Sequence, residues 1–320
     1  MKSRILITGA SGFIGTNLLQ YYLDSGYDVI NIDINPPQNC NHQKYWHNID
    51  VNNFISLNNE IYKFNPDYVI HLAARTDLNG LNPEDYSANT LGVQNLVEAL
   101  KKNENLQRVV FTSSQLVCYG HQPIDYNDYH TINLYGESKR LGELIVRNDP
   151  EIFFEWVIIR PTSIWGPWFR EPYHKFFKMI INKTYFHLEN NSCTKTYGYI
   201  ENLIYQINSI LFAPSIEVQS KIFYLGDYEP TKIYSWANEI ASEIGIKIKT
   251  APYYLIKLGA YIGDILKFFK ISFPISSFRL KNMTSNNIVD LSNTKGIAPN
   301  LPYSRIEGIR KTLEWLKENK

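Results

Sequence analysis

Cysteine, methionine and net charge are all scarce in this chain of 320 residues. The 3 cysteines lie far apart and form no CxxC pair, which argues against a disulfide framework and against a zinc site. So few cysteines fit a reducing compartment, and we expect the cytoplasm. Lysine and arginine number 32 against 31 acidic residues, so no global field attracts nucleic acid. An anionic ligand must therefore be held by a local site.

Long apolar runs are missing as well, and we expect no export signal. Residues 1–4 lead straight into an apolar segment without the hydrophobic core of a signal peptide. The most apolar stretch, 253–269, is interrupted by Lys257, Asp264 and Lys267 and is short for a membrane span. It predicts a buried amphipathic helix, with attachment to one membrane surface as the alternative. We therefore expect no stable membrane insertion.

Strand-like and helix-like segments alternate through the first half of the chain. This alternation predicts a parallel sheet covered by helices on both faces. The expected strands are 5–8, 29–33, 45–49, 68–72, 109–112 and 153–160, and the expected helices are 13–25, 84–102 and 135–147. After Pro161 the sequence becomes aromatic-rich, and segments 197–200 and 222–225 are expected to return to the sheet as late strands.

A glycine-rich turn lies between the first expected strand and the first expected helix. Glycine lets the backbone turn tightly and approach a pyrophosphate, whose charge then lies at the helix N-terminus. The turn therefore predicts a dinucleotide site, and a merely tight strand–helix connection is the alternative. The residues expected to contact the cofactor here are Gly9, Ser11, Gly12, Phe13, Ile14 and Gly15.

Asp33 ends the second expected strand, about 18 residues after the last glycine of this turn. A carboxylate at this point accepts hydrogen bonds from both ribose hydroxyls and repels a 2′-phosphate, so NAD is favoured over NADP. Asp50 and Val51 end the next strand and are expected near the adenine, with an ordinary surface loop as the alternative. The fold class expected is α/β, a doubly wound parallel (Rossmann) sheet.

The domains are expected to be interleaved, since no flexible linker interrupts the chain. Residues 1–165 plus about 196–226 are assigned to the NAD-binding domain. The smaller C-terminal substrate lobe takes about 166–195 plus 227–320.

Tyr135 and Lys139 are spaced i and i+4 in the expected helix 135–147 and therefore lie on one helix face. A free tyrosine has a pKa near 10 and is a poor base at neutral pH. A nearby ammonium, together with the positive nicotinamide ring, stabilises the phenolate and lowers that pKa. The pair predicts a general acid–base centre, and an exposed helix pair is the alternative.

Four segments together resemble the extended short-chain dehydrogenases, the NAD-dependent epimerase/dehydratase group. They are residues 8–15, Asp50-Val51, residues 71–74 and Tyr135 to Lys139. The resemblance covers nearly the whole chain. It implies that Leu72, Ala73, Ala74 and Pro161 contact the cofactor and that Lys139 also bonds the nicotinamide ribose.

The same resemblance implies a third catalytic group after the strand 109–112. Ser114 is the choice, with Ser113 second and Gln115 the position reached by counting back from Tyr119-Gly120. Sugar-nucleotide dehydratases of the family have Asp-Glu after this group. This chain has Gln115-Leu116 instead, so we expect no dehydration.

The resemblance also implies a substrate site for a sugar linked to a nucleotide diphosphate. Ser163 lies near the position of a substrate-contacting Asn, and Lys195 replaces an Arg that binds the diphosphate. Arg279 lies where a second phosphate-binding Arg is often found. Tyr135 and Ser114 are expected to contact the reacting hydroxyl. For Lys195 and Arg279, solvated surface positions are the alternative.

The function expected is NAD-dependent redox chemistry on a nucleotide-linked sugar, by a 4-epimerase or a C4 dehydrogenase of polysaccharide biosynthesis. A 4-ketosugar-nucleotide reductase is one alternative. Another is a hydroxysteroid-dehydrogenase-like enzyme for an apolar alcohol, suggested by the stretch 253–269. A non-catalytic NAD-binding regulator would be expected to lack an intact Tyr135/Lys139 pair.

A homodimer is expected, because helices 84–102 and 135–147 correspond to those that pair in dimeric members of the family. The apolar residues that suggested this pairing are Leu91, Leu96, Val97 and Leu100, with a role in the core as the alternative.

Overall fold

A seven-stranded parallel sheet forms the centre of the computed structural model, which describes residues 2–120, 123, 125–189, 193–268, 280 and 284–319. The strands follow the order β11-β6-β5-β4-β1-β2-β3, and every pairing is parallel. Their bounds are β1 (Arg4–Thr8), β2 (Asp28–Asp33), β3 (Trp46–Asn48), β4 (Tyr68–His71), β5 (Arg108–Thr112), β6 (Glu155–Pro161) and β11 (Lys221–Leu225). The strand order reverses between β1 and β4, the place where ligands bind in sheets of this type.

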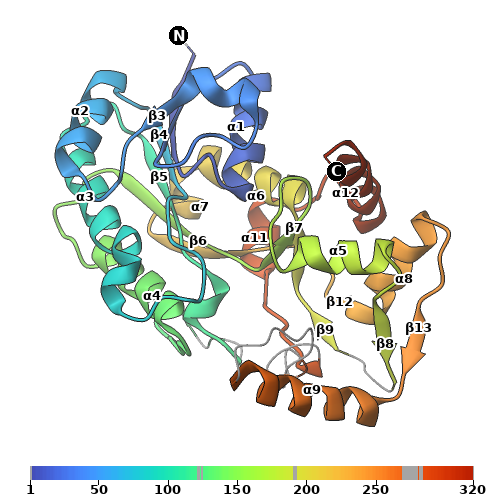
Figure 1. Cartoon of the computed structure of the whole chain (residues 1–320). Coiled ribbons are helices and arrows are strands. Elements are labelled where there is room, and N and C mark those ends of the chain that lie inside the picture. The colour runs from blue at the N-terminus through green and yellow to red at the C-terminus, as the bar shows by residue number, and fades with distance from the viewer. Residues whose placement is uncertain are drawn as a thin grey trace.

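Helices cover both faces of the sheet (Figure 1). One face carries α2 (Phe54–Phe64), α3 (Leu91–Leu100) and α4 (Leu134–Arg147), and the other carries α1 (Phe13–Asp24) and α6 (Ile200–Phe212). Apolar residues form two core clusters, one on each side of the sheet, and the cluster under α1 and α6 continues beyond the sheet into the aromatic-rich segments after Pro161. The expected doubly wound α/β class is confirmed.

Short sheets and helices make up the rest of the molecule. The two-stranded sheets are β7 (Ser163–Trp165) with β10 (Tyr197–Tyr199), β9 (Thr194–Lys195) with β12 (Thr231–Lys232), and β8 (Phe186–Leu188) with β13 (Lys249–Ala251). The helices are α5 (Tyr173–Ile181), α7 (Ser215–Val218), α8 (Ile233–Glu243), α9 (Tyr253–Phe268), α11 (Ser292–Ile297) and α12 (Arg305–Glu318). The division into two lobes at the expected boundaries stays a prediction.

The six expected strands of the first half are present, with ends within two residues of those expected. The single helix expected at 84–102 is wrong. A 3-10 helix, η2 (Pro83–Asn89), precedes α3, and Thr90 between them has φ −123° and ψ −74°, which are not helical. The segment 222–225 joins the central sheet as β11, but 197–200 does not, because β10 pairs with β7 outside it.

The stretch 253–269 also differs from expectation. It forms α9 up to Phe268, but Tyr254 and Leu258 are exposed, so the helix is not buried as expected. Within the described part of the chain, no helix has both the length and the apolar character needed to cross a membrane.

A buried ion pair attaches α4 to the sheet. The guanidinium of Arg160 on β6 donates two hydrogen bonds, of 2.8 and 2.7 Å, to the carboxylate of Glu143 on α4. Its remaining donors reach the Tyr224 hydroxyl on β11 at 2.9 Å and the Tyr126 carbonyl at 3.1 Å. The Arg160 side chain is 0% exposed and that of Glu143 is 2% exposed, so both charges depend on each other for solvation.

We predict that Glu143→Gln lowers the free energy of unfolding by about 3 kcal/mol, because it leaves the Arg160 charge buried without a counter-charge. Urea denaturation measures the change. The matched control is Glu243→Gln, which removes the carboxylate of the exposed pair with Arg310 and should change the free energy of unfolding far less. Equal losses for the two variants would contradict the structural role given to the buried pair.

Candidate active site

The glycine turn follows β1, at the point where the strand order reverses. Gly9 has φ +76°, and a Cβ on it would lie 2.5 Å from the backbone nitrogen of Ala73. A Cβ on Gly15 would lie 2.4 Å from the Cα of Ala10. These two glycines are therefore required by close packing of the turn against the segment after β4 and against α1.

Gly12 has a different role at the N-terminus of α1. A Cβ there would meet only the Gly9 carbonyl oxygen, at 3.2 Å. No side chain caps this end, and the first turn of α1, which begins with Phe13 and Ile14, holds no acidic residue. The first amide groups of the helix are therefore available to an anionic ligand. The turn fits the pyrophosphate of a dinucleotide.

Asp33 lies beside this turn at the end of β2. Its carboxylate accepts hydrogen bonds from the backbone amides of Ser11, at 3.1 Å, and Asn35, at 2.9 Å. Burial raises the pKa of Asp33, while the bonds from Asn35 and Ser11 oppose that rise. The carboxylate is half-buried beside the glycine turn, and its contact with the ribose stays a prediction.

The other expected cofactor residues lie at or just beyond the ends of β4, β3 and β6. Leu72 and Ala73 follow β4 and lie against Gly9, and Ala74 comes next in the chain. The side chain of Val51 is in the core, whereas Asp50 is exposed and accepts a hydrogen bond from the amide of Asn52. Pro161 is buried at the end of β6.

Tyr135 and Lys139 lie on the buried face of α4. The side chains of Tyr135 and Ser114 are hydrogen-bonded to each other. The ammonium of Lys139 donates to the carbonyl oxygen of Thr112, the last residue of β5, at 2.8 Å. Tyr135 is 8% exposed, Ser114 9% and Lys139 5%. The structure thus brings the three expected catalytic residues together where β5 ends.

Burial moves the pKa values of Tyr135 and Lys139 apart. It raises the pKa of Tyr135 to about 12, against a smaller opposing effect of the Ser114 hydrogen bond. It lowers the pKa of Lys139 to about 8, partly opposed by the Glu143 carboxylate. The sequence predicted a lowered pKa for Tyr135, and this prediction is wrong. The pKa is raised, because desolvation is the largest effect on the phenol.

Of the three candidates for the third catalytic position, Ser114 is the one hydrogen-bonded to Tyr135. The Gln115 side chain points elsewhere: its amide nitrogen donates to Ser163 Oγ at 3.2 Å, and its oxygen accepts from the Asn287 amide at 3.0 Å. The hydroxyl of Ser163 is also hydrogen-bonded to the half-buried Tyr173. Gln115 therefore connects the end of β5 to Ser163 on β7 and to Asn287.

Lys195 lies next to Asn287, the residue that Gln115 contacts. It is half-buried, and its backbone pairs with β12 and forms a bridge to Asn287, whose side chain reaches Gln115. Burial lowers the pKa of Lys195. Arg279 lies outside the described residues. Asn287 was missed in the sequence, since 172 residues separate it from Gln115 and no motif surrounds it.

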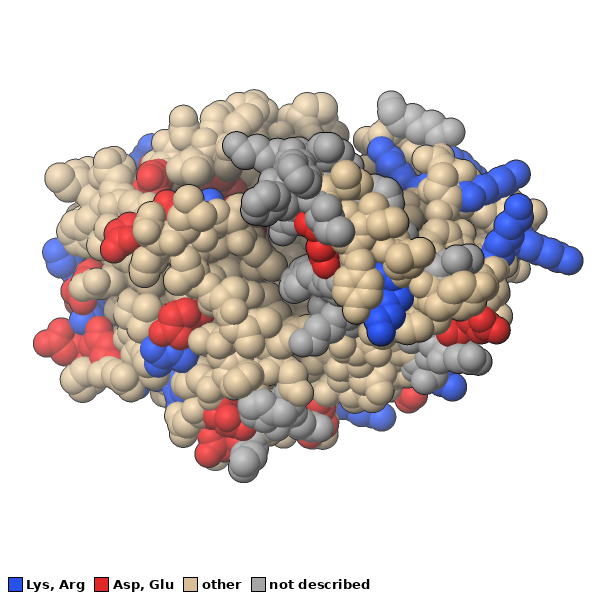
Figure 2. Space-filling view, turned by 60° about the horizontal axis from the view of Figure 1, so that its bottom comes forward, with Lys and Arg blue, Asp and Glu red and all other residues tan. Residues whose placement is uncertain are grey.

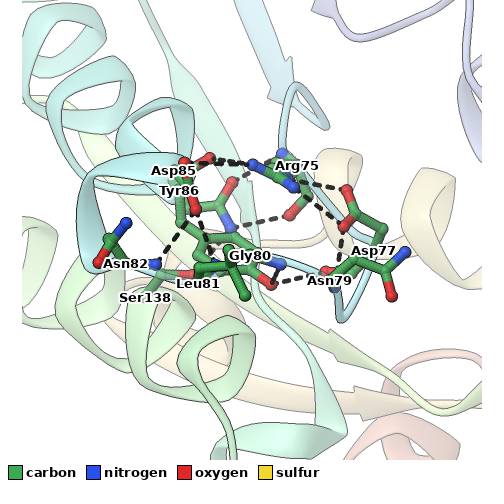
Figure 3. A network of polar contacts seen from close by, with 10 residues as sticks. Arg75, Asp77, Asn79, Gly80, Leu81, Asn82, Asp85, Tyr86 and Ser138 are labelled. Carbon is green, nitrogen blue, oxygen red and sulfur yellow. Dashed lines mark hydrogen bonds and ion pairs between the residues drawn. The ribbon is translucent and has the colours of Figure 1, made fainter. Parts of the chain in front are cut away.

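The loop after β4 is a second feature that the sequence did not indicate (Figure 3). The Arg75 guanidinium donates to both carboxylate oxygens of Asp77, at 2.8 and 3.2 Å, and to the Asp85 carbonyl at 3.1 Å. The Tyr86 hydroxyl donates to the Asp77 carbonyl at 2.8 Å, and the ring centroids of Tyr86 and Tyr135 are 6.3 Å apart. These bonds fix the loop beside Tyr135.

Comparison with known proteins identifies the family. The model of the NAD dependent epimerase/dehydratase family matches residues 5–201, more than half of the chain. The chain belongs to this family. The family's cofactor is NAD, which agrees with the cofactor expected from the glycine turn and Asp33.

Three known proteins illustrate the range of this similarity. An undecaprenyl-diphosphate-linked N-acetylglucosamine 4-epimerase of Escherichia coli O157:H7 is 27% identical, over 98% of this chain and 96% of its own. A 3-beta-hydroxysteroid dehydrogenase of Mycolicibacterium neoaurum is 28% identical, over 77% of this chain and 71% of its own. The solved UDP-glucuronic acid 4-epimerase of Bacillus cereus with NAD has a TM-score of 0.75 at 19% identity, covering 98% of this chain and 96% of its own, and shares the fold.

For cofactor choice, we predict that the protein binds NAD at least about tenfold more tightly than NADP, about 1.4 kcal/mol. The Asp33 carboxylate repels a 2′-phosphate, so Asp33→Ser should bring the ratio of NAD affinity to NADP affinity closer to one. Titration calorimetry with both dinucleotides measures it. Asp28→Ser, at the other, exposed end of β2, is the control and should leave the ratio unchanged. Equal binding of NAD and NADP by the wild type would contradict the ribose assignment.

Proposed function

We propose that this member of the epimerase/dehydratase family is a 4-epimerase that acts on a nucleotide-linked sugar. The observation that carries the proposal is the buried group of Ser114, Tyr135 and Lys139 directly beyond β5, on the cofactor side of the sheet. Relatives and fold neighbours named as sugar 4-epimerases support it. A C4 dehydrogenase or a 4-ketosugar reductase would carry out half of the same cycle.

The residues of the chain divide the work of binding and proton transfer. When bound, NAD supplies the chemistry of accepting a hydride from the sugar carbon and giving it back. The open amide groups at the N-terminus of α1 hold the diphosphate, and Asp33 holds the ribose. Tyr135, as the phenolate, takes the proton from the sugar hydroxyl, and Ser114 orients that hydroxyl through a hydrogen bond.

Lys139 controls the charge at Tyr135. A phenol with a pKa of about 12 holds its proton at neutral pH, so a positive charge must come close when the proton moves. The ammonium of Lys139 is the buried cation of this group, and its own pKa of about 8 keeps most of it charged at pH 7. Dehydration is disfavoured, because Gln115 has no ionisable side chain to act as acid or base.

The substrate contacts are proposals as well. We place the sugar between Ser114 and Ser163, since Gln115 joins Ser163 to the end of β5. Lys195 would neutralise the diphosphate as a point charge, without the two-pronged grip of an arginine. Arg279 is proposed as the second cation of that site.

A second candidate substrate is a sugar diphosphate carried on a polyprenol, the type of compound named for the Escherichia coli relative. The observation that favours it is the exposed apolar face of α9. The similarity to a 3-beta-hydroxysteroid dehydrogenase makes an apolar alcohol a third candidate substrate. Mass spectrometry of products from UDP-sugars, polyprenyl diphosphate sugars and 3-hydroxysteroids separates the three.

We also propose a cytoplasmic homodimer that pairs through α3 and α4. Of the apolar residues that suggested it, Leu96, Val97 and Leu100 are buried in the core, so the exposed Leu91 and Leu141 are the residues left to form the contact. Light scattering checks the dimer. A mass of one chain at micromolar concentration would contradict it.

We predict that Tyr135→Phe lowers kcat by about 10²–10⁴-fold, while NAD affinity and thermal stability stay near wild type. The variant keeps the ring, which packs against Tyr86, and removes only the oxygen that transfers the proton. The measurements are turnover on the substrate found in the screen, calorimetry with NAD and a thermal melt.

Lys139→Met is the companion variant and should lose both rate and NAD affinity, because Lys139 acts on the phenol and on the cofactor. Its pH profile should show the basic-side group at a higher apparent pKa than in the wild type, since the positive charge that favours the phenolate is gone. If the chemical step limits the rate and Tyr135→Phe still turns over at the wild-type rate, the proposed mechanism is contradicted.

A further inference from the structure

An apolar stripe runs along the outer face of α9. Tyr254 is 69% exposed, Leu258 58%, Tyr261 54% and Ile262 45%. These positions follow the spacing i, i+4, i+7 and i+8, so the four side chains lie on one side of the helix. Tyr253, at 42%, adds a fifth exposed side chain at the first position of the helix.

The opposite face of α9 is apolar as well. Ile256 packs into a small cluster with Phe186, Leu188 and Leu280, and Gly263 is buried. A helix on the surface of a globular protein normally turns its one apolar face to the core and a polar face to water. The inner face of α9 already packs against this small cluster. Packing within the described part of the chain therefore does not explain the exposed stripe.

Charge around α9 differs from that of the whole chain. Residues 247–281 hold seven lysines and arginines and one acidic residue, although the net charge of the protein is only +1. Among the described ones, Lys247, Lys249 and Lys257 are exposed. Seen from the α9 side, acidic side chains are spread over the left of the surface, and long lysine and arginine side chains project from the right (Figure 2).

The stripe lies on the side of the molecule that leads to the candidate active site. In Figure 1, α9 crosses the bottom of the molecule as its outermost element. Asn287, which follows α9 in the sequence, hydrogen-bonds Gln115 and pairs with Lys195.

We propose that α9 is a membrane-docking helix that lies in the interface of a bilayer containing anionic lipids. Tyrosine rings and aliphatic side chains with flanking lysines are the composition of helices that bind in this way. The helix has 16 residues and is about 24 Å long, too short to cross the hydrocarbon core, so it lies on the surface. A second copy of the chain fits less well, because two such basic regions would repel each other. The proposal does not depend on the reaction catalysed.

The test is flotation of the full-length protein with vesicles of 30 mol% phosphatidylglycerol in phosphatidylcholine and with vesicles of phosphatidylcholine alone. We expect the protein to float with the anionic vesicles at 0.1 M salt. Binding to neutral vesicles, or to the anionic ones at 0.5 M salt, should be at least tenfold weaker, because screening removes the attraction of the lysines.

The variant Tyr254→Ser/Leu258→Ser/Tyr261→Ser removes the stripe and should lower vesicle binding at least tenfold. The matched control, Tyr62→Ser/Ile216→Ser, removes apolar side chains that are 84% and 87% exposed on the other half of the molecule, and it should bind like the wild type. Lys257→Glu tests the charge separately and should weaken binding to anionic vesicles. Thermal melts and NAD binding establish that each variant is folded.

Three results would overturn the proposal. The wild type fails to float with anionic vesicles, or the α9 variant floats as well as the wild type. In the third, the α9 variant changes the mass measured by light scattering while vesicle binding stays the same, which would assign the stripe to contact between copies of the chain.

Discussion

The buried pair of Arg160 and Glu143 is the contact on which the geometry of the candidate active site depends. It joins α4 to β6 and, through the Tyr224 hydroxyl, to β11. The face of α4 that meets the sheet is polar: Tyr135, Ser138, Lys139 and Glu143 are all buried on it. Such a face gains little from apolar burial, so its stability rests on bonds that satisfy each polar group.

Those bonds also determine how the site ionises. Asn89 donates to the Ser138 hydroxyl at 2.8 Å, and the carbonyl of Thr112 accepts from Lys139. A Cβ on Gly142 would lie 2.6 Å from the carbonyl oxygen of Asn89, so the helix approaches its neighbour closely. The resulting burial raises the pKa of Tyr135 and lowers that of Lys139. Packing of α4 therefore controls the proton chemistry proposed for the phenol.

Local patterns in the sequence predicted most of the sheet and both motifs of the site. Strand periodicity, the glycine turn and the Tyr135/Lys139 spacing are signals carried by a few neighbouring residues. The break at Thr90 and the pairing of β10 with β7 depend on tertiary packing, which overrides propensity. The role of Arg160 could not be read from the sequence either, because its partner Glu143 belongs to a different element.

The contacts made by residues after Pro161 were harder still to predict. Gln115 and Asn287 meet across 172 residues, and neither belongs to a pattern that sequence periodicity can detect. For α9, an apolar helical pattern predicted burial, but the same pattern also suits a helix that binds a surface outside the chain. Composition alone does not separate these two environments, and the exposure of Tyr254 and Leu258 does.

The central claim is the proposed inversion of C4 of a nucleotide-linked sugar, for which bound NAD would supply the uptake and return of one hydride. The most direct test uses a nucleotide sugar deuterated at C4, with the product analysed by NMR. The account predicts an inverted C4 centre that retains the deuterium, without transfer of the label to added NAD. Accumulation of a keto sugar, with the deuterium in the pool of reduced cofactor, would contradict epimerisation.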